Sequence, residues 1–156
     1  MISFMFLPRV DDLSWSAEGL RDRPARTLTA DDLTFHYFNA DVVINDGQNE
    51  IHLRTPGLPV VDFTLMVVQL YRDVMSSGES VVESSQTQDS ISAVRRGDDV
   101  EISYSFSCVV SSVSLDEFKE MAISALRSAL SVLYAAHENL RYNRYLADIS
   151  SLDCMG

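Results

Sequence analysis

Apolar and polar residues alternate over residues 99–112, which is typical of a β-strand with one face on the core and the other in water. Residues 91–96 and 80–88 precede it as two more strands, joined by turns, and residues 1–8 predict another. The side chains expected to point inward on the longest strand are those of Val100, Ile102, Tyr104, Phe106, Cys108 and Val110. The pattern therefore predicts consecutive antiparallel strands with one buried face.

Small hydroxyl side chains occupy the other face of these strands. They come from Ser92, Ser103, Ser105 and Ser107. Such a flat face is either ordinary solvent surface or a platform on which another chain docks, and the sequence leaves both interpretations open.

A hairpin is predicted over residues 33–54, with Asp46-Gly47 as a two-residue turn, because both residues tolerate positive φ. Counting outward from this turn places apolar residues on one face and polar residues on the other. Phe35 and Tyr37 fall on the polar face, so either a bulge intervenes or that face is partly covered. The expected facing pairs are Asn45 with Gln48, Val43 with Glu50, Val42 with Ile51, Asp41 with His52, Ala40 with Leu53 and Asn39 with Arg54.

Two helices follow from apolar residues spaced three and four apart. The first begins at Pro59 and ends near Ser77-Gly78. The second begins at Ser114 with a capping box completed by Glu117. Its inward stripe consists of Phe118, Ala122, Ala125, Leu126, Ala129, Leu133, Ala136 and Leu140.

These elements predict an α+β fold: a mainly antiparallel sheet of about six strands with two main helices packed on one face. At 156 residues, with 46% hydrophobic residues, the chain matches a single domain over 1–156. We expect residues 9–32 to form an irregular loop rich in acidic residues and arginine, and residues 147–156 to form a tail.

The charge balance is strongly acidic, with 23 acidic and 12 basic residues and a net charge of −11. A phosphate backbone would be repelled by this field, so nucleic acid is excluded as a partner. The acidity either serves solubility alone or attracts a basic protein partner. The chain is expected to act as a monomer or homodimer.

The longest apolar run, residues 59–71, is too short to cross a membrane. Residues 1–8 lack the basic leading region of a signal peptide, so we expect a cytoplasmic protein without a membrane partner. Cys108 and Cys154 lie far apart with no metal spacing around them, which predicts two free thiols.

Candidate chemistry is sparse. No histidine, cysteine or carboxylate spacing predicts a metal, and no glycine-rich loop predicts a phosphate or other cofactor. Asp41 facing His52 could orient a general base, but no nucleophile accompanies it, and a solvated cross-strand ion pair is the simpler interpretation. We therefore predict no catalytic residues and no enzyme activity.

The acidic loops at the strand ends, the serine face, and Pro56-Gly57-Leu58-Pro59 before an apolar helix resemble, in layout, small acidic immunity proteins with which bacteria neutralise toxin domains. The Pro-x-x-Pro segment is also similar to one in some uncharacterised bacterial domains. The resemblance implies an inhibitor whose acidic surface covers the basic cleft of a cognate toxin. The partner contacts it implies are Asp31, Asp32, Asp41, Glu50, Asp98 and Asp99.

Two other functions stay open. The chain could be a small enzyme or ligand-binding domain with a pocket between the 59–77 helix and the sheet, and with His36 or Tyr37 at its mouth. It could also be a structural subunit that assembles through exposed strand edges or through the cationic and aromatic end at residues 141–145.

Overall fold

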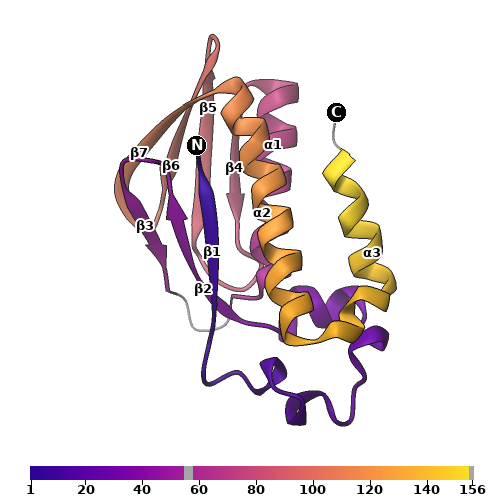
Figure 1. The fold of residues 1–156 in the computed structure, drawn as a ribbon. Coiled ribbons are helices and arrows are strands. Elements are labelled where there is room, and N and C mark those ends of the chain that lie inside the picture. The colour runs from indigo at the N-terminus through magenta and orange to yellow at the C-terminus, as the bar shows by residue number, and fades with distance from the viewer. Residues whose placement is uncertain (55–57, 155–156) are drawn as a thin grey trace.

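The computed structural model describes residues 1–54 and 58–154, and it has an α+β architecture in which β-sheets lie on one side and helices on the other (Figure 1). The described strands are β1 (Ser3–Pro8), β2 (Ala40–Asn45), β3 (Glu50–Leu53), β4 (Glu79–Glu83), β5 (Ser90–Arg96), β6 (Asp99–Tyr104) and β7 (Ser107–Ser114). The α-helices are α1 (Val60–Ser77), α2 (Leu115–Ala136) and α3 (Arg144–Ser150).

The strands form two antiparallel sheets, a three-stranded sheet in the order β1-β2-β3 and a four-stranded sheet in the order β4-β5-β6-β7. The predicted α+β class with antiparallel strands is confirmed, but the described strands form two sheets and not one, and they number seven where about six were predicted. The extra strand arises because residues 99–112 are not one strand. The chain reverses at Ser105-Phe106, where Tyr104 pairs with Ser107 beside a register shift.

This reversal changes which side chains of residues 105–114 are buried. Cys108 and Val110, expected inside, are exposed, whereas Ser111 and Val113 are buried. Up to Tyr104, buried and exposed side chains alternate as predicted. After the turn, the residues expected to be exposed are buried and those expected to be buried are exposed. Cys108 is a free thiol, as predicted, and Cys154 lies outside the residues whose side chains the structure describes.

The hairpin of β2 and β3 forms with a register different from the predicted one. Ile44 faces Ile51, and Val43 faces His52. The turn has four residues because the Asp46 carboxylate accepts hydrogen bonds from the backbone N–H groups of Gln48 and Asn49 at 2.9 and 2.6 Å. The shift is an even number of residues, so the predicted apolar face is still the buried one, although the predicted facing pairs are wrong.

Residues 33–39 do not extend the hairpin. Asp32–His36 form a π-helical turn, and Phe38 is buried with a φ of 62°. Asn39 makes an isolated bridge to Pro59, not to Arg54. The expected conflict over Phe35 and Tyr37 is therefore removed, because neither residue lies in a strand.

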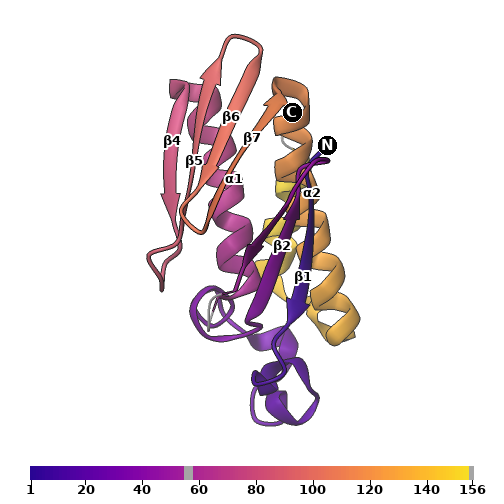
Figure 2. The ribbon, with the colours of Figure 1, turned by 90° about the vertical axis from the view of Figure 1, so that its left-hand side faces the viewer.

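Both predicted helices begin where the sequence predicts, and α1 also ends there. Pro59 precedes α1, and Gly78 ends it with a φ of 87°, which glycine adopts without strain. The Ser114 hydroxyl accepts from the Glu117 N–H at 3.2 Å and caps α2. Helix α1 lies behind the four-stranded sheet and α2 behind the three-stranded sheet (Figure 2).

The core lies between these two layers. Phe63 of α1 packs edge to face against Phe4 and Phe6 of β1, each at a centroid distance of 5.7 Å. No backbone ladder joins β3 to β7 in the described part of the chain, so the sheets meet through side chains. Ser111 donates to the Asp46 carboxylate at 2.7 Å, and the Tyr104 and Ser111 hydroxyls are 3.0 Å apart. This polar chain connects the β2–β3 turn to the four-stranded sheet.

The C-terminal region is more ordered than the predicted tail. Helix α2 ends at Ala136, short of Leu140, and a 3-10 turn leads to α3. The buried Asn143 side chain caps α3 through the Leu146 N–H and donates to the carbonyls of Ala25 and Leu28, both at 2.9 Å. The C-terminal segment is thereby tied to the irregular segment near the N-terminus, which has the expected loop character with three short 3-10 turns.

Candidate functional site: the outer face of the sheets

The face of both sheets opposite the helices is uncovered in the described structure, and Figure 2 shows the two outer faces turned toward the same side. On the four-stranded sheet, pairing aligns Val81, Ser92, Ser103 and Val110 in one row across all four strands. Val81 is 66% exposed and Val110 is 54% exposed. The row has small, short side chains at its centre and a valine at each end.

Carboxylates flank this central row: Glu79, Glu83 and Glu101 occupy the next outward positions, and Asp99 lies one outward position beyond Glu101. Glu79 and Glu83 lie at the two ends of β4, and Glu101 and Asp99 lie on β6. Of these four side chains, Glu101 forms an ion pair, with Arg96 at 3.2 Å, and the others form none within residues 1–54 and 58–154. The rim of the row is therefore negatively charged.

The outer face of the three-stranded sheet also combines exposed apolar residues with carboxylates. Met5, Val43 and His52 form one row, with Met5 57% exposed. Asp41 lies beside Leu7 and accepts from Arg9 at 2.8 Å. The outward strand positions of the two sheets together carry six carboxylates and one arginine. The carboxylates belong to Asp41, Glu50, Glu79, Glu83, Asp99 and Glu101, and the arginine is Arg96.

The six predicted partner contacts do not form one cluster. Asp41, Glu50 and Asp99 lie on the outer face, and Asp98 lies in the turn at its end, where its carbonyl accepts from the Leu115 N–H. The remaining two belong to the π-helical turn, which lies at the opposite end of the molecule from the β5–β6 turn (Figure 1).

Asp32 has a local structural role in that turn. Its carboxylate accepts from the Thr29 N–H at 2.9 Å and pairs with Arg23. Burial tends to raise the pKa of Asp32, but the hydrogen bonds from Thr29 and the charge of Arg23 outweigh it and lower the pKa below its ordinary value. Asp31 beside it is exposed.

The hypothesis of a general base formed by Asp41 and His52 is wrong, because the observed register separates the two residues. His52 faces Val43, and its Nε2 lies 3.6 Å from the Glu50 carboxylate. Asp41 faces Leu7 and binds Arg9. The serine platform, by contrast, forms in part: Ser92 and Ser103 are paired in the central row, while Ser105 is in a turn and accepts from the Ser90 N–H.

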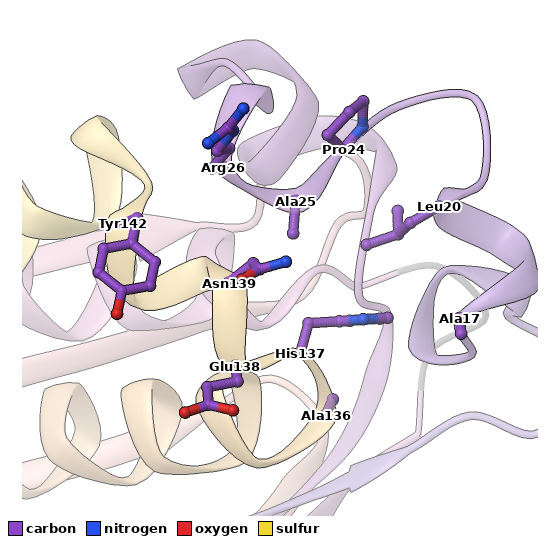
Figure 3. A pocket seen from close by; sticks show the side chains of 10 residues that line it. All are labelled: Ala17, Leu20, Pro24, Ala25, Arg26, Ala136, His137, Glu138, Asn139 and Tyr142. Carbon is purple, nitrogen blue, oxygen red and sulfur yellow. The ribbon is translucent and has the colours of Figure 1, made fainter.

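A pocket with a volume of about 690 Å³ lies between the irregular N-terminal segment and the end of α2 (Figure 3). Arg26, Glu138, Asn139 and Tyr142 line it together with small apolar side chains. His137 also lines it, with Nε2 2.7 Å from the Ser14 carbonyl oxygen, so one ring nitrogen is already engaged in holding the loop.

The pocket expected between α1 and the sheet is also present, with a volume of about 380 Å³, and it includes Asp62 and Glu83. His36 and Tyr37 do not lie at its mouth, because they line a separate pocket of about 560 Å³ beside Arg9. The buried Asp62 carboxylate accepts from the Ser85 N–H at 3.1 Å. The elements expected to form one ligand site are thus in different places.

Asp12 lines the pocket of about 560 Å³ that contains His36 and Tyr37. Its carboxylate accepts from the backbone and side chain of both Ser14 and Asn39. Burial acts to raise the pKa of Asp12, but these four hydrogen bonds lower it overall. The two bonds from Asn39 attach the loop to the start of β2, and the two from Ser14 cap a short 3-10 turn, so the arrangement accounts for folding without requiring a ligand.

The cationic and aromatic end at residues 141–145 is partly used within the chain. The Arg141 guanidinium lies 4.8 Å from the centre of the Tyr134 ring, and Tyr145 is half-buried against the core. Tyr142 remains 74% exposed.

Sequence reasoning missed four exposed apolar residues of the outer face, Met5, Leu7, Val81 and Val110. Val110 was assigned to the core because the turn before it was not recognised. Among the described residues no group of three or more histidine, cysteine or acidic side chains could hold a metal ion, and no helix is long and apolar enough to span a membrane. Models of protein families, curated proteins and solved structures were compared with the chain, and none of them matched it.

Proposed function

We propose that the chain is a protein-binding module that docks a basic partner on the outer face of its two sheets. The observation that supports this most is the central row from Val81 to Val110, which has exposed valines at both ends, serines between them, and carboxylates beside it. An apolar and small-residue centre with a polar rim is the usual composition of a protein interface.

The physical roles of centre and rim differ. Serine and valine side chains at the centre lose little conformational entropy on docking, and burying the valines removes apolar surface from water. The carboxylates at the rim attract a basic partner over a distance and set its orientation. The association rate should therefore fall as salt is added.

Within this class, we favour an inhibitor of the immunity type, which covers the basic cleft of a cognate toxin. The net charge of −11 and the surplus of carboxylates on the outer face support this proposal. Of the predicted contacts, we assign Asp41, Glu50 and Asp99, which lie on the outer face, and Asp98 at its end to this interaction. The proposal assigns no reaction and no cofactor to the chain.

The proposal is tested with a charge-reversed outer face, Glu79→Lys, Glu83→Lys and Glu101→Lys, against the protein encoded by the neighbouring gene in the host genome. The matched control changes three exposed acids on the helical side, Glu120→Lys, Glu138→Lys and Asp148→Lys, and so alters the net charge equally. We expect the outer-face variant to bind at least about tenfold more weakly and to lose protection of cell growth, because three complementary contacts are reversed.

The control separates local docking from overall charge. Equal weakening by both variants would attribute binding to net charge alone and would contradict docking on the outer face. Full binding by the outer-face variant would contradict it as well. Binding of the unmodified chain should also weaken as salt is raised from 0.05 to 0.5 M.

A second function, binding of a small molecule, is favoured by the pocket in Figure 3, whose volume of about 690 Å³ falls in the range of ligand sites. Its test is native mass spectrometry of the chain purified from its host. A retained molecule that is lost on Asn139→Leu substitution would support this function, and an unmodified mass would contradict it.

A further inference from the structure

Strand β1 has a free edge. It pairs with β2 along its whole length, from Ser3 opposite Asn45 to Pro8 opposite Ala40, and no described strand lies on its other side. A groove of about 490 Å³ follows this edge between β1 and α2. Its lining residues are Phe4, Met5 and Phe6 from β1, and Arg127, Ser128, Ser131, Val132 and Ala135 from α2.

The edge lacks the usual protection against pairing with another strand. Natural edge strands carry charged residues, bulges or central prolines that prevent such pairing. Strand β1 contains no charged residue, its proline is the terminal residue, and Met5 and Leu7 are 57% and 43% exposed. An uncovered strand of this kind presents both unpaired backbone groups and apolar side chains.

We propose that a second copy of this chain covers the edge, with the two β1 strands pairing antiparallel across a twofold axis. Such an interface must be self-complementary, because the same residues are supplied from both sides. The sequence Phe4-Met5-Phe6 meets this requirement, since it reads the same in both directions about Met5. The β1 edge adjoins the docking face at Met5, but the inference does not rest on the proposed function.

Geometry restricts the register, and the symmetry of Phe4-Met5-Phe6 selects its centre. In an antiparallel pair, directly opposed side chains lie on the same face of the sheet, so an inward residue must oppose an inward residue. The twofold axis therefore passes through a residue and not between two residues. Centring on Met5 places Phe4 of one copy opposite Phe6 of the other and keeps Pro8, which has no N–H, outside the central pairs.

Helix α2 leaves room for the added strand. Ser128, Ser131 and Ala135 have small side chains, and they form the side of the groove over which an inward phenylalanine of the second copy would lie. The inward faces of both copies would then share one continuous layer of aromatic residues, Phe4 and Phe6 from each chain, beneath a sheet of six strands.

Salt separates this inference from the docking proposal. Each copy carries a net charge of −11, so the two copies repel one another over a distance, while β1 itself is uncharged. Raising the salt concentration screens this repulsion and should strengthen the dimer. The same change should weaken docking of a basic partner, so failure of one proposal can be distinguished from failure of the other.

The first test measures molar mass by sedimentation equilibrium across a hundredfold range of concentration. We expect twice the chain mass of 17.4 kDa at the upper concentrations. Met5→Lys should weaken the dimer at least about tenfold, because two lysines would face each other across the axis. Val81→Lys, an exposed position on the other free edge strand, should leave the dimer intact.

The second test determines the register. In a background with Cys108→Ser and Cys154→Ser, Met5→Cys should form a disulfide-linked dimer on mild oxidation, because opposed Cα atoms lie about 4.5–5.5 Å apart in an antiparallel pair. Leu7→Cys should not, because Leu7 would face Ser3 of the other copy. Circular dichroism of each variant confirms that it is folded.

Several results would overturn the inference. They are a mass of 17.4 kDa at every concentration, a dimer that survives Met5→Lys, a dimer that dissociates equally in Val81→Lys, and cross-linking of Leu7→Cys as fast as that of Met5→Cys. Each of them would show that the β1 edge is not the contact between copies.

Discussion

The three-stranded and four-stranded sheets bury their inner faces in the same way but differ at their free edges. Each packs alternate apolar side chains against a long amphipathic helix. On the side away from the junction of the sheets, the four-stranded sheet ends in β4, with Glu79 and Glu83 at its two ends, whereas the three-stranded sheet ends in β1, which carries no charge. The charges on β4 oppose pairing with another strand, whereas β1 has no charge that would oppose it.

The junction between the sheets differs from the layer beneath it. Below, Phe63 joins the two layers through apolar contacts with β1. At the junction, hydroxyl and carboxylate groups of Tyr104, Ser111 and Asp46 connect the sheets where no backbone ladder does. The apolar layer stabilises both sheets together, while the polar chain sets their relative position.

The largest expected effect comes from the shared apolar layer. Phe63→Ala removes a fully buried ring and should lower the free energy of unfolding by about 3–5 kcal/mol, because it leaves a cavity against Phe4 and Phe6. Urea denaturation followed by circular dichroism measures the loss. Val81→Ala, at an exposed position, should change it by less than about 0.5 kcal/mol.

The same variant tests whether the sheets form one cooperative unit. Amide hydrogen exchange should accelerate in both sheets of the Phe63→Ala variant, since α1 packs against β4 and β5 of one sheet and β1 of the other. Acceleration confined to β1–β3 would show that the four-stranded sheet folds independently.

The polar junction should contribute less. Ser111→Ala leaves the buried Tyr104 hydroxyl without its bond to Ser111 and removes a donor to Asp46, so we expect a loss of about 1–3 kcal/mol in urea denaturation. Adding Tyr104→Phe should recover part of the loss, because the unsatisfied hydroxyl is then absent. Ser112→Ala, at the exposed neighbouring position, serves as the control, and an equal loss there would contradict the role of the junction.

The comparison of the two edges can be reversed by substitution. Glu79→Ser with Glu83→Ser removes the charges at the ends of β4 and should strengthen self-association through that edge about tenfold, because like charges no longer oppose pairing. Sedimentation velocity measures the change. Glu120→Ser with Glu138→Ser alters the net charge equally on the helical side, and the same increase there would assign the effect to overall charge.

The smallest expected effect is a fall in folding stability at acid pH. Burial acts to raise the pKa of Asp46, but the hydrogen bonds from Ser111, Gln48 and Asn49 lower it below 3.8 in the folded chain. Its contribution to stability is therefore present above the unfolded value near 3.8 and is lost as pH falls through the lower folded pKa. Exposure of this carboxylate to solvent limits the contribution to less than about 1 kcal/mol.

Asp46→Asn provides the measurement. The difference in unfolding free energy between the unmodified chain and this variant should be larger at pH 6 than at pH 2.5. A difference that does not change with pH would show that the Asp46 charge has no part in the junction.

Local signals explain what sequence reasoning predicted well. Ser114 and Gly78 mark helix ends because capping depends on neighbouring backbone groups alone, and both boundaries are confirmed. Alternation identified the buried residues of β5 and β6 for the same reason. The turn at Ser105-Phe106 was missed because it contains neither glycine nor proline. The hairpin register was wrong because the Asp46 side chain, bonding to two backbone N–H groups, widened the turn.

Of the candidate surface, sequence reasoning placed Ser92 and Ser103 on an outward face, but it did not find Val81 and Val110 at the ends of their row. Whether a valine lies inside or outside depends on which strands flank it, and a single strand does not contain that information. The carboxylates named as contacts were dispersed for the same reason, because pairing between distant strands decides which of them share a face.

By itself, the sequence determined both ends of α1, the start of α2, the apolar faces of most strands and the acidic surface, because each follows from the nearest neighbours of a residue along the chain. Only the tertiary structure decided that the strands divide into two sheets, that the outer face carries an exposed row between carboxylates, and that β1 ends the three-stranded sheet without protection. These features depend on contacts between residues far apart in the chain, where the relative free energies of whole packings, and not local preferences, select the arrangement.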